Sequence, residues 1–278
     1  MHDRVTSYQE EAEMKLGALQ REISKYDSLI IAYSGGLDSS LLLKAATMVL
    51  GEKSMAVISD SPSIPRSELN LALQFATDIK ARIRIIKTDE VDNKNYAANP
   101  ANRCYFCKTE LYEVLQRVAE EEGMRYIANG TNLDDLGDYR PGLRAADEHT
   151  VVSPLKDAGL TKNDIRMIAK HLNLNVWDKP ASPCLASRIP YGSEVTREKL
   201  TQVEQAEEYI KNLGIRELRV RHFGPKAVIE VNPLDKRIIE FHLSNIHTRF
   251  TQLGFLTIEI KEFQSGSLNK LINIDAKG

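Results

Sequence analysis

The sequence contains little cysteine, few aromatic residues and no long apolar run, and each shortage excludes a class of protein. Among 278 residues there are 3 cysteines and 1 tryptophan, and aromatic residues make up 6%. Three cysteines do not build the disulfide framework of a small secreted protein, which leaves metal binding, sulfur chemistry or burial as their role. No stretch approaches the ~20 apolar residues of a membrane-spanning helix. We therefore expect no membrane insertion.

Neither sign of charge is in large excess. The chain has 37 basic and 39 acidic residues, a formal net charge of -2 and an isoelectric point near 6.3. Such a balance gives no overall field that would attract a polyanion such as tRNA. The first residues lack the basic start and apolar centre of a secretory signal. We expect a cytoplasmic protein without a nucleic-acid partner.

Apolar runs of strand length alternate with helical patterns through most of the chain. We predict strands at residues 28–33, 54–60, 82–87 and 125–129, and helices at about 7–25, 65–78 and 108–122. Strands that alternate with helices in this way are typical of parallel βαβ units. The pattern predicts an α/β fold with a doubly wound parallel sheet.

A stiff segment with three prolines, residues 179–192, separates this region from a second pattern. After it we predict helices at about 197–213 and 234–253, and strands at 218–221, 227–231 and 256–260. This mixture predicts a smaller C-terminal α+β domain. We place the two domains at residues 1–192 and 193–278.

A glycine turn joins the first predicted strand to the helix that follows it. Backbone N–H groups at a helix N-terminus bind phosphate, and glycines let a polyanion approach the backbone. The motif is not a Walker A loop, because no Gly-Lys-Ser/Thr follows at the required offset. Similar turns in many doubly wound folds bind nothing. The turn reads Ser34-Gly35-Gly36-Leu37-Asp38-Ser39-Ser40.

This motif resembles the PP-loop of the ATP pyrophosphatase superfamily, whose members bind ATP and transfer AMP to an acceptor. The resemblance implies that Asp38 helps to hold Mg²⁺ and that the serines donate to phosphate oxygens. Asp60 ends the second predicted strand and Ser61 follows it, at the edge where open parallel sheets bind ligands. The residues that we assign to nucleotide binding in these segments are Ala32, Ser34, Gly35, Gly36, Asp38, Ser39, Ser40, Asp60 and Ser61.

The cysteines form a pair, Cys104 and Cys107, and a single Cys184 in the proline-containing segment. A structural zinc site normally needs four ligands, and no histidine has a convincing spacing to complete one. A 4Fe-4S cluster with three cysteine ligands leaves one iron open for a ligand such as sulfide. A thioredoxin-like redox pair and simple burial remain alternatives for these thiols.

Three segments together resemble one family of ATP-dependent sulfur insertases. They are the loop at residues 34–40, the segment 130–135 and the segment 182–188, which reads Ser-Pro-Cys-Leu-Ala-Ser-Arg. The family makes the nickel-pincer cofactor of lactate racemase and is called pyridinium-3,5-bisthiocarboxylic acid mononucleotide synthase. The resemblance adds Gly130, Asp134 and Arg188 to the cofactor-binding residues.

The resemblance implies that the chain adenylates a carboxylate of pyridinium-3,5-biscarboxylic acid mononucleotide and replaces it with a thiocarboxylate. Members with a single cysteine, matching Cys184, give up its sulfur and become dehydroalanine. Members with three cysteines resemble enzymes that carry sulfide on a 4Fe-4S cluster, and we place this chain among them, with Cys104, Cys107 and Cys184 as catalytic residues and cluster ligands. Family members assemble as hexamers, so we expect a homo-oligomer.

In the second domain, the substrate's phosphate is expected to meet arginines of one strand. Arg219 and Arg221 alternate to one face, where two guanidiniums can clamp a phosphate. Glu230, and with less support Glu207, adds a substrate or metal contact by analogy with the family. A solvated strand face is the alternative interpretation of these side chains.

Other functions remain open at this point. A PP-loop tRNA thiolase shares the adenylation chemistry but needs a nucleic-acid surface. An amidating relative, such as an NAD or GMP synthase, does not need three thiols. A non-catalytic nucleotide-binding iron-sulfur protein would bind ATP without releasing pyrophosphate.

Overall fold

The computed structural model describes residues 2–137 and 141–264, and it contains two compact units whose segments alternate along the chain. The first unit comprises the chain up to residue 61, residues 66–88 and residues 104–182. The second comprises residues 62–65, residues 89–103 and the chain from residue 183 onward. We describe each unit by itself.

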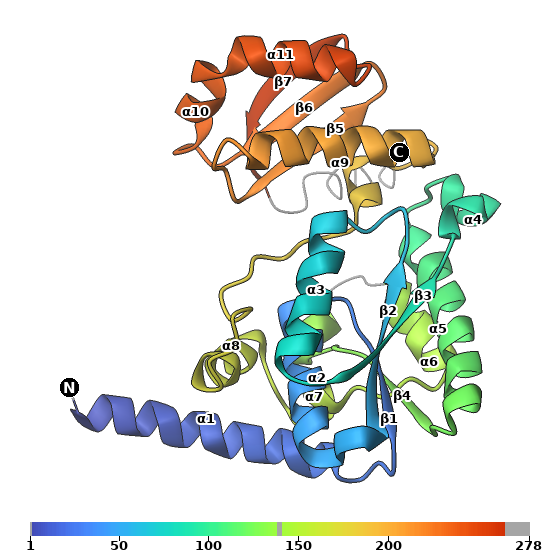
Figure 1. Cartoon of the computed structure of the whole chain (residues 1–278), viewed down its shortest axis with the longest axis vertical. Coiled ribbons are helices and arrows are strands. Elements are labelled where there is room, and N and C mark those ends of the chain that lie inside the picture. Colours follow the sequence, from blue (N-terminus) through green and yellow to red (C-terminus); the bar gives the residue numbers. More distant parts are fainter. Residues whose placement is uncertain (1, 138–140, 265–278) are drawn as a thin grey trace. The chain divides into compact units, whose positions relative to one another are not determined.

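A parallel sheet of four strands forms the centre of the first unit (Figure 1). Its strand order is β3-β2-β1-β4, and every neighbouring pair is parallel. This confirms the predicted α/β fold with a parallel sheet. The strands are β1 (Leu29–Ala32), β2 (Ser54–Asp60), β3 (Arg82–Lys87) and β4 (Tyr126–Ala128).

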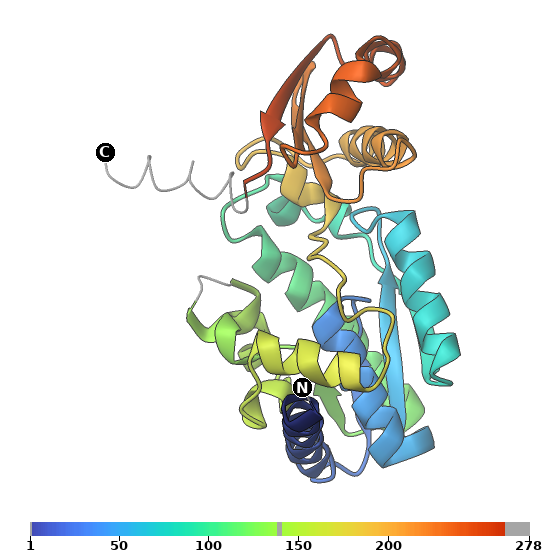
Figure 2. The ribbon, with the colours of Figure 1, turned by 90° about the vertical axis from the view of Figure 1, so that its left-hand side faces the viewer.

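Helices cover both faces of this sheet. Helix α2 packs against β1 and β2, and α3 packs against β3. Helix α1 packs against α2 and α8, and Figure 2 shows α1 nearly end-on with α8 (yellow) crossing beside it. The α-helices are α1 (His2–Ile23), α2 (Leu37–Leu50), α3 (Arg66–Asp78), α5 (Arg103–Glu122), α6 (Pro141–Glu148), α7 (Pro154–Asp157) and α8 (Lys162–His171), and the 3₁₀ helices are η1 (Gly51–Lys53) and η3 (Leu133–Gly137).

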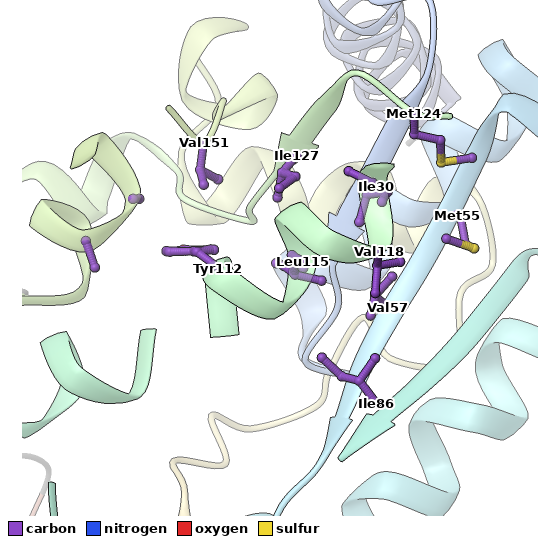
Figure 3. Close-up of a cluster of buried hydrophobic side chains, with 14 residues drawn as sticks. Ile30, Met55, Val57, Ile86, Tyr112, Leu115, Val118, Met124, Ile127 and Val151 are labelled. Carbon is purple, nitrogen blue, oxygen red and sulfur yellow. The ribbon is translucent and has the colours of Figure 1, made fainter. Parts of the chain in front are cut away.

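The core between the sheet and α5 is apolar and tightly covered (Figure 3). Alternate strand residues such as Ile30 and Val57 point to this face, as the two-residue period of a strand requires. They meet Tyr112, Leu115 and Val118 on α5, which recur at helical spacing. Burial of each such side chain contributes about 1.5–3 kcal/mol. This packing fixes the sheet that carries the loops described below.

The strand order creates a switch point beside β1. The chain runs outward from β1 to β2 and β3 and then returns to place β4 on the other side of β1. The loops that follow β1 and β4 both begin at the carboxyl ends of these neighbouring strands. Open α/β sheets bind their ligands beside such a switch point.

The second unit contains a three-stranded sheet in the order β5-β6-β7. The β5–β6 pair is antiparallel and the β6–β7 pair is parallel. Its core gathers Val220, Ile229 and Phe250. The elements are η2 (Glu90–Asp92), α4 (Lys94–Ala97), η4 (Leu185–Arg188), α9 (Arg197–Lys211), β5 (Leu218–Phe223), β6 (Lys226–Val231), α10 (Lys236–Phe241), α11 (Leu243–Gln252) and β7 (Thr257–Glu262). A separate C-terminal domain with a boundary after residue 192 stays a prediction.

The structure corrects several predicted elements. The helix expected from residue 108 begins at Arg103. The sequence did not indicate this start, because the first turn lacks the apolar spacing that marks the rest of the helix. The helix expected at 234–253 is two helices, α10 and α11, which meet at His242. Helices α6 and α8 were not predicted at all. No helix in the described ranges is long and apolar enough to cross a membrane.

Candidate functional site

The loop after β1 takes a shape that only glycine permits. Gly35 has φ +69°, a conformation that side chains rarely adopt. A Cβ there would lie 2.5 Å from the Cβ of Ala72 on α3. The loop therefore lies directly against α3, and Gly35 itself is buried. Gly36 follows as the N-cap of α2 and brings no side chain to cover the helix start.

Three serines of the loop differ in their surroundings. Ser34 is exposed, and its hydroxyl lies 3.0 Å from that of Ser39, which also donates to the carbonyl of Gly36. Ser40 is fully buried beside the Tyr33 hydroxyl, at 3.4 Å. Burial raises the pKa of Tyr33 to about 12, so its hydroxyl stays protonated and donates to the Ala72 carbonyl. Ser34 and Ser39 are thus better placed than Ser40 to meet a phosphate.

Asp38, in the first turn of α2, is the centre of a polar cluster. Its Oδ2 accepts from Lys162 Nζ at 2.5 Å, and its Oδ1 accepts from Asn132 Nδ2 at 3.4 Å. Lys162 is the first residue of α8, and its backbone N–H donates to Asp134 Oδ2 at 2.8 Å. The cluster therefore joins the loop after β1, the loop after β4 and the start of α8.

A second lysine reaches the same loop. Lys179 Nζ donates to the carbonyl oxygen of Gly35 at 2.9 Å and forms an ion pair with Glu68 of α3 at 2.8 Å. The Lys179 side chain is 16% exposed, so its charge is largely removed from water. With Lys162, two ammonium groups lie beside the glycine turn, a charge arrangement suited to a polyphosphate.

The loop after β4 approaches the phosphate loop closely. A Cβ on Gly130 would lie 2.9 Å from the backbone nitrogen of Ser39. Asn129 holds the loop's turn by accepting from Thr131 N and from the Ser153 hydroxyl. Gly130 is thus required by the close packing of two backbones.

Asp60 is the last residue of β2 and Ser61 follows it, where the sequence placed them. The carboxylate of Asp60 pairs with Arg66, whose Nη2 also donates to the Ser61 carbonyl at 2.6 Å. Ala32 is the last residue of β1 and is buried. These three residues therefore border the carboxyl ends of two adjacent strands, within the first unit.

The cysteine pair lies at the start of α5. Cys104 is exposed and Cys107 is partly buried. Residues three apart on a helix face the same side, so both thiols can serve one centre. Cys184 belongs to the second unit, where it is partly buried as the N-cap of η4. In the ranges that the structure describes, no three His, Cys, Asp or Glu side chains are gathered as a metal-binding group.

Arg188 forms hydrogen bonds with the backbone on both sides of the Cys184 side chain. Its Nη1 donates to the carbonyls of Pro183 at 2.6 Å and Cys184 at 3.2 Å. Its Nε and Nη2 form a two-pronged pair with Glu207 of α9, at 2.8 and 3.1 Å. Both side chains are at most 4% exposed. Arg188, predicted to contact a cofactor, is thus directed at the chain around Cys184.

Arginines of β5 form a positively charged group in the second unit. Arg221 pairs with Glu230 at 2.8 Å and donates to the Ser187 carbonyl at 2.8 Å. Arg219 lies over the ring of Phe263, 4.7 Å from its centroid. The pKa of Arg219 is lowered, first by burial and then by the positive charges of Arg188 and Arg221. Such mutual repulsion falls when an anion binds.

The sequence analysis did not assign Lys162, Lys179, Asn132 or Glu68 to the site. Lys162 lies 124 positions from Asp38 and Lys179 lies 144 from Gly35. A signal for Lys162 was available in the Thr161 and Asp164 capping box that begins α8 directly before it. Asn132 lies within the segment 130–135 that carried the family resemblance.

Comparison with known proteins gives relatives that span nearly the whole chain. An uncharacterized protein of Synechocystis sp. is 43% identical over 264 residues, 94% of this chain and 98% of that protein. The pyridinium-3,5-bisthiocarboxylic acid mononucleotide synthase of Lactiplantibacillus plantarum is 32% identical over 260 residues, 92% of this chain and 94% of that protein. One component of the glutamine-hydrolyzing GMP synthase of Methanothermobacter thermautotrophicus is 28% identical over 216 residues, 71% of this chain and 68% of that protein. No family model matches the chain.

Proposed function

The chain belongs to the family of the pyridinium-3,5-bisthiocarboxylic acid mononucleotide synthase, and from this membership we propose that it is an ATP-dependent sulfur insertase. Its substrate in this proposal is pyridinium-3,5-biscarboxylic acid mononucleotide, one carboxylate of which becomes a thiocarboxylate. The observation that carries the proposal is the cluster of Gly35, Asp38, Gly130 and Lys162 at the switch point of the sheet. The relationship to a component of a GMP synthase supports the use of ATP.

The residues of the first unit fit a magnesium-bound ATP. Gly35 and Gly130 let the loops after β1 and β4 pack closely beside the start of α2, and backbone N–H groups at a helix start can bind phosphate. Asp38 offers carboxylate oxygens, the ligand type that Mg²⁺ prefers. Lys162 and Lys179 would leave their carboxylate partners and neutralise phosphate charge. Ser34 and Ser39 add hydroxyl donors.

The reaction proposed at this site is adenylation. An oxygen of the substrate carboxylate attacks the α-phosphorus of ATP, the bond to the β-phosphate breaks, and pyrophosphate leaves. Sulfur then forms a bond to the acyl carbon as AMP leaves with the electron pair of the broken C–O bond. The chain's contribution is to position the reactants and to neutralise charge.

The three cysteines supply a donor set that fits an iron-sulfur cluster. A 4Fe-4S cluster with three thiolate ligands has one iron that can carry an additional sulfide. Cys104 and Cys107 face one side of α5, and Arg103, the residue directly before Cys104, is buried in the second unit, where it donates to the carbonyl of Ala186. This connection along the chain supports Cys184 as the third ligand.

A sacrificial role for Cys184 is the second candidate, favoured by its partial exposure. In that reaction the Cys184 thiolate displaces AMP to form a thioester. Loss of the Cα proton and cleavage of the Cβ–S bond would then release the thiocarboxylate and leave dehydroalanine. Such a chain would react once.

We further propose that Arg219 and Arg221 bind the phosphate of the substrate. The cluster of Arg188, Arg219 and Arg221 with Glu207 and Glu230 contains three cations and two anions. The excess of one positive charge, partly buried, suits a phosphate monoester. The cytoplasmic location and a homo-oligomeric, hexameric assembly remain predictions.

The test is anaerobic purification followed by two measurements. Iron and acid-labile sulfide are counted in the wild type and in Cys184→Ala, and pyrophosphate release is followed with ATP and the biscarboxylate substrate. About four irons per chain, lost in the variant, and multiple turnovers support the cluster mechanism. A wild-type chain without iron after reconstitution, which loses the mass of H₂S from Cys184 in one turnover, supports the sacrificial mechanism.

Two further outcomes contradict the proposal as a whole. A chain that binds ATP but releases no pyrophosphate with this substrate is a nucleotide-binding protein. A chain that releases pyrophosphate only with tRNA is a tRNA thiolase.

A further inference from the structure

The segment around Cys184 is held by one buried ion pair. Arg188 Nη1 donates to the carbonyls of Pro183 and Cys184, the two peptide groups that flank the Cys184 side chain. The same Nη1 lies 3.0 Å from the Ser187 hydroxyl. Leu185 N donates to the Ser63 carbonyl at 2.8 Å, so the backbone is fixed on the other side as well.

Glu207 connects this guanidinium to the sheet of the second unit. Its Oε1 accepts from Arg188 Nε and also from the backbone nitrogen of Val220 on β5, at 3.0 Å. Its Oε2 accepts from Arg188 Nη2. The side chains of Arg188 and Glu207 are 4% and 3% exposed. A planar two-pronged pair in such surroundings has one orientation, and that orientation is set by β5 and α9.

All three nitrogens of Arg188 are therefore occupied by this chain's own acceptors. A guanidinium in that state is well suited to fix a backbone, because it connects two carbonyls to a rigid carboxylate.

We propose that Arg188 is a positioning residue, held by Glu207, that aims the Cys184 thiol during sulfur transfer. The inference rests on the proposed function, in which Cys184 either holds the cluster that carries the sulfide or gives its own sulfur to the acyl carbon. A misplacement of about 1 Å can lower a rate about 100-fold. The role is separate from adenylation, whose residues lie in the first unit.

The test uses Arg188→Lys and Glu207→Gln in the full chain. Lysine keeps the charge but cannot bind two carbonyls and a carboxylate in one plane. Glutamine keeps the shape of Glu207 and an acceptor for Val220 N, so this variant is the more conservative for folding. The matched controls are Arg197→Lys, an exposed arginine that pairs with Asp89 and Asp92, and Glu208→Gln, the exposed neighbour of Glu207.

Two readouts separate positioning from a merely structural role. The first is the ratio of thiocarboxylate formed to pyrophosphate released. We expect both variants to lower this ratio about 100-fold. The second is the alkylation rate of each cysteine by iodoacetamide in the cluster-free chain, measured peptide by peptide. We expect Cys184 alone to react several-fold faster, while Cys104 and Cys107 serve as internal controls.

The outcomes distinguish this inference from the proposed function. Equal losses of pyrophosphate release and thiocarboxylate mean that Arg188 acts on nucleotide or substrate binding, and they overturn the positioning role. An unchanged alkylation rate at Cys184 in both variants also overturns it. A wild-type chain that releases no pyrophosphate overturns the proposed function, while the alkylation measurement still decides whether Arg188 and Glu207 hold the Cys184 segment.

Discussion

Gly35 shows how one residue can make a phosphate loop possible. Its backbone has φ +69°, and a Cβ would collide with Ala72. The sequence indicated that glycine was needed for approach of a polyanion, but the packing against α3 was not readable, because Ala72 lies on another element. The structure adds this second reason for glycine at the position.

We expect Gly35→Ala to destabilise the chain by more than the roughly 1–2 kcal/mol that a left-handed conformation costs an ordinary residue. The matched control is Gly123→Ala, because Gly123 has φ +64° but open space around its Cβ position. Urea denaturation measures both. Equal losses in the two variants would show that the contact with Ala72 relaxes without cost.

Lys162 has a carboxylate partner in the ligand-free chain, and the proposed function requires it to exchange that partner for phosphate. We expect Lys162→Met to raise KM for ATP by about tenfold or more, as loss of a charged hydrogen bond of about 1.5–3 kcal/mol implies. Lys170→Met, on the same helix but stacked on Trp177, serves as control. An unchanged KM in Lys162→Met would remove this lysine from the phosphate site.

His222 makes stability depend on pH. Its ring is buried on β5, 2.8 Å from the Gln202 amide oxygen, and burial, followed by the charge of Lys199, lowers the pKa of His222. The unfolded chain therefore binds this proton more readily than the folded chain. The contribution is full above the unfolded value of about 6.5 and declines as pH falls below it.

We expect the free energy of unfolding to fall from about pH 7.5 to 5.5 in the wild type and to fall less in His222→Gln. His247→Gln, an exposed histidine of α11, should keep the wild-type dependence. Urea titrations at the two pH values provide the measurement. If the free energy of unfolding depends on pH in the same way in His222→Gln and in the wild type, that dependence comes from groups other than His222.

Elements with a clear local pattern were predictable, and elements defined by distant contacts were not. The strands at 54–60 and 82–87 begin and end where the sequence placed them, since the first buries an apolar run and the second combines isoleucines with charged residues. Helix α10 ends at Phe241 and α11 begins at Leu243, a break that helical spacing alone conceals. The start of α5 at Arg103 was missed because the first turn lacks the apolar spacing of the rest.

Helix α8 was missed although it carries Lys162 to Asp38. Its start is fixed by a capping box, in which Thr161 accepts from Asp164 N and Asp164 accepts from Thr161 N. Recognition of this box before Ile165 and Ile168 would have predicted the helix. The candidate site therefore depends on an element that composition does not reveal.

We expect Thr161→Ala to cost about 1 kcal/mol of stability and to raise KM for ATP without any contact to the nucleotide. The reason is that a frayed first turn releases Lys162. Thr196→Ala removes the equivalent cap of α9, in the second unit, and should lower stability with KM for ATP unchanged. A similar rise in KM in both variants would attribute it to general loosening.

The alternation of the two units along the chain bears on where the protein can be cut. Within the second unit, Asn99 donates to the carbonyls of Ile189, Pro190 and Ser193. The backbone of Val195 donates to the carbonyl of Ala97 at 2.8 Å. Segment 89–103 thus depends on residues on both sides of the boundary that we predict after residue 192.

We expect a fragment of residues 1–192 to lose protection of segment 89–103 while the parallel sheet persists. Limited proteolysis with peptide mapping measures this, with the full chain as control. Early cleavage within 89–103 in the fragment alone is the expected result. Equal resistance in both would support residues 1–192 as a self-sufficient domain.

The distance along the chain between Asn99 and its carbonyl partners also delays the folding of the second unit during synthesis on the ribosome. They lie 90 to 94 residues further along the chain. At about 5–20 residues per second, the nascent chain waits on the order of 5 to 20 s before these partners emerge. During that interval Tyr96, which is almost fully buried in the finished protein, has no completed unit to enter. The segment around Tyr96 is therefore open to ribosome-associated chaperones during that interval.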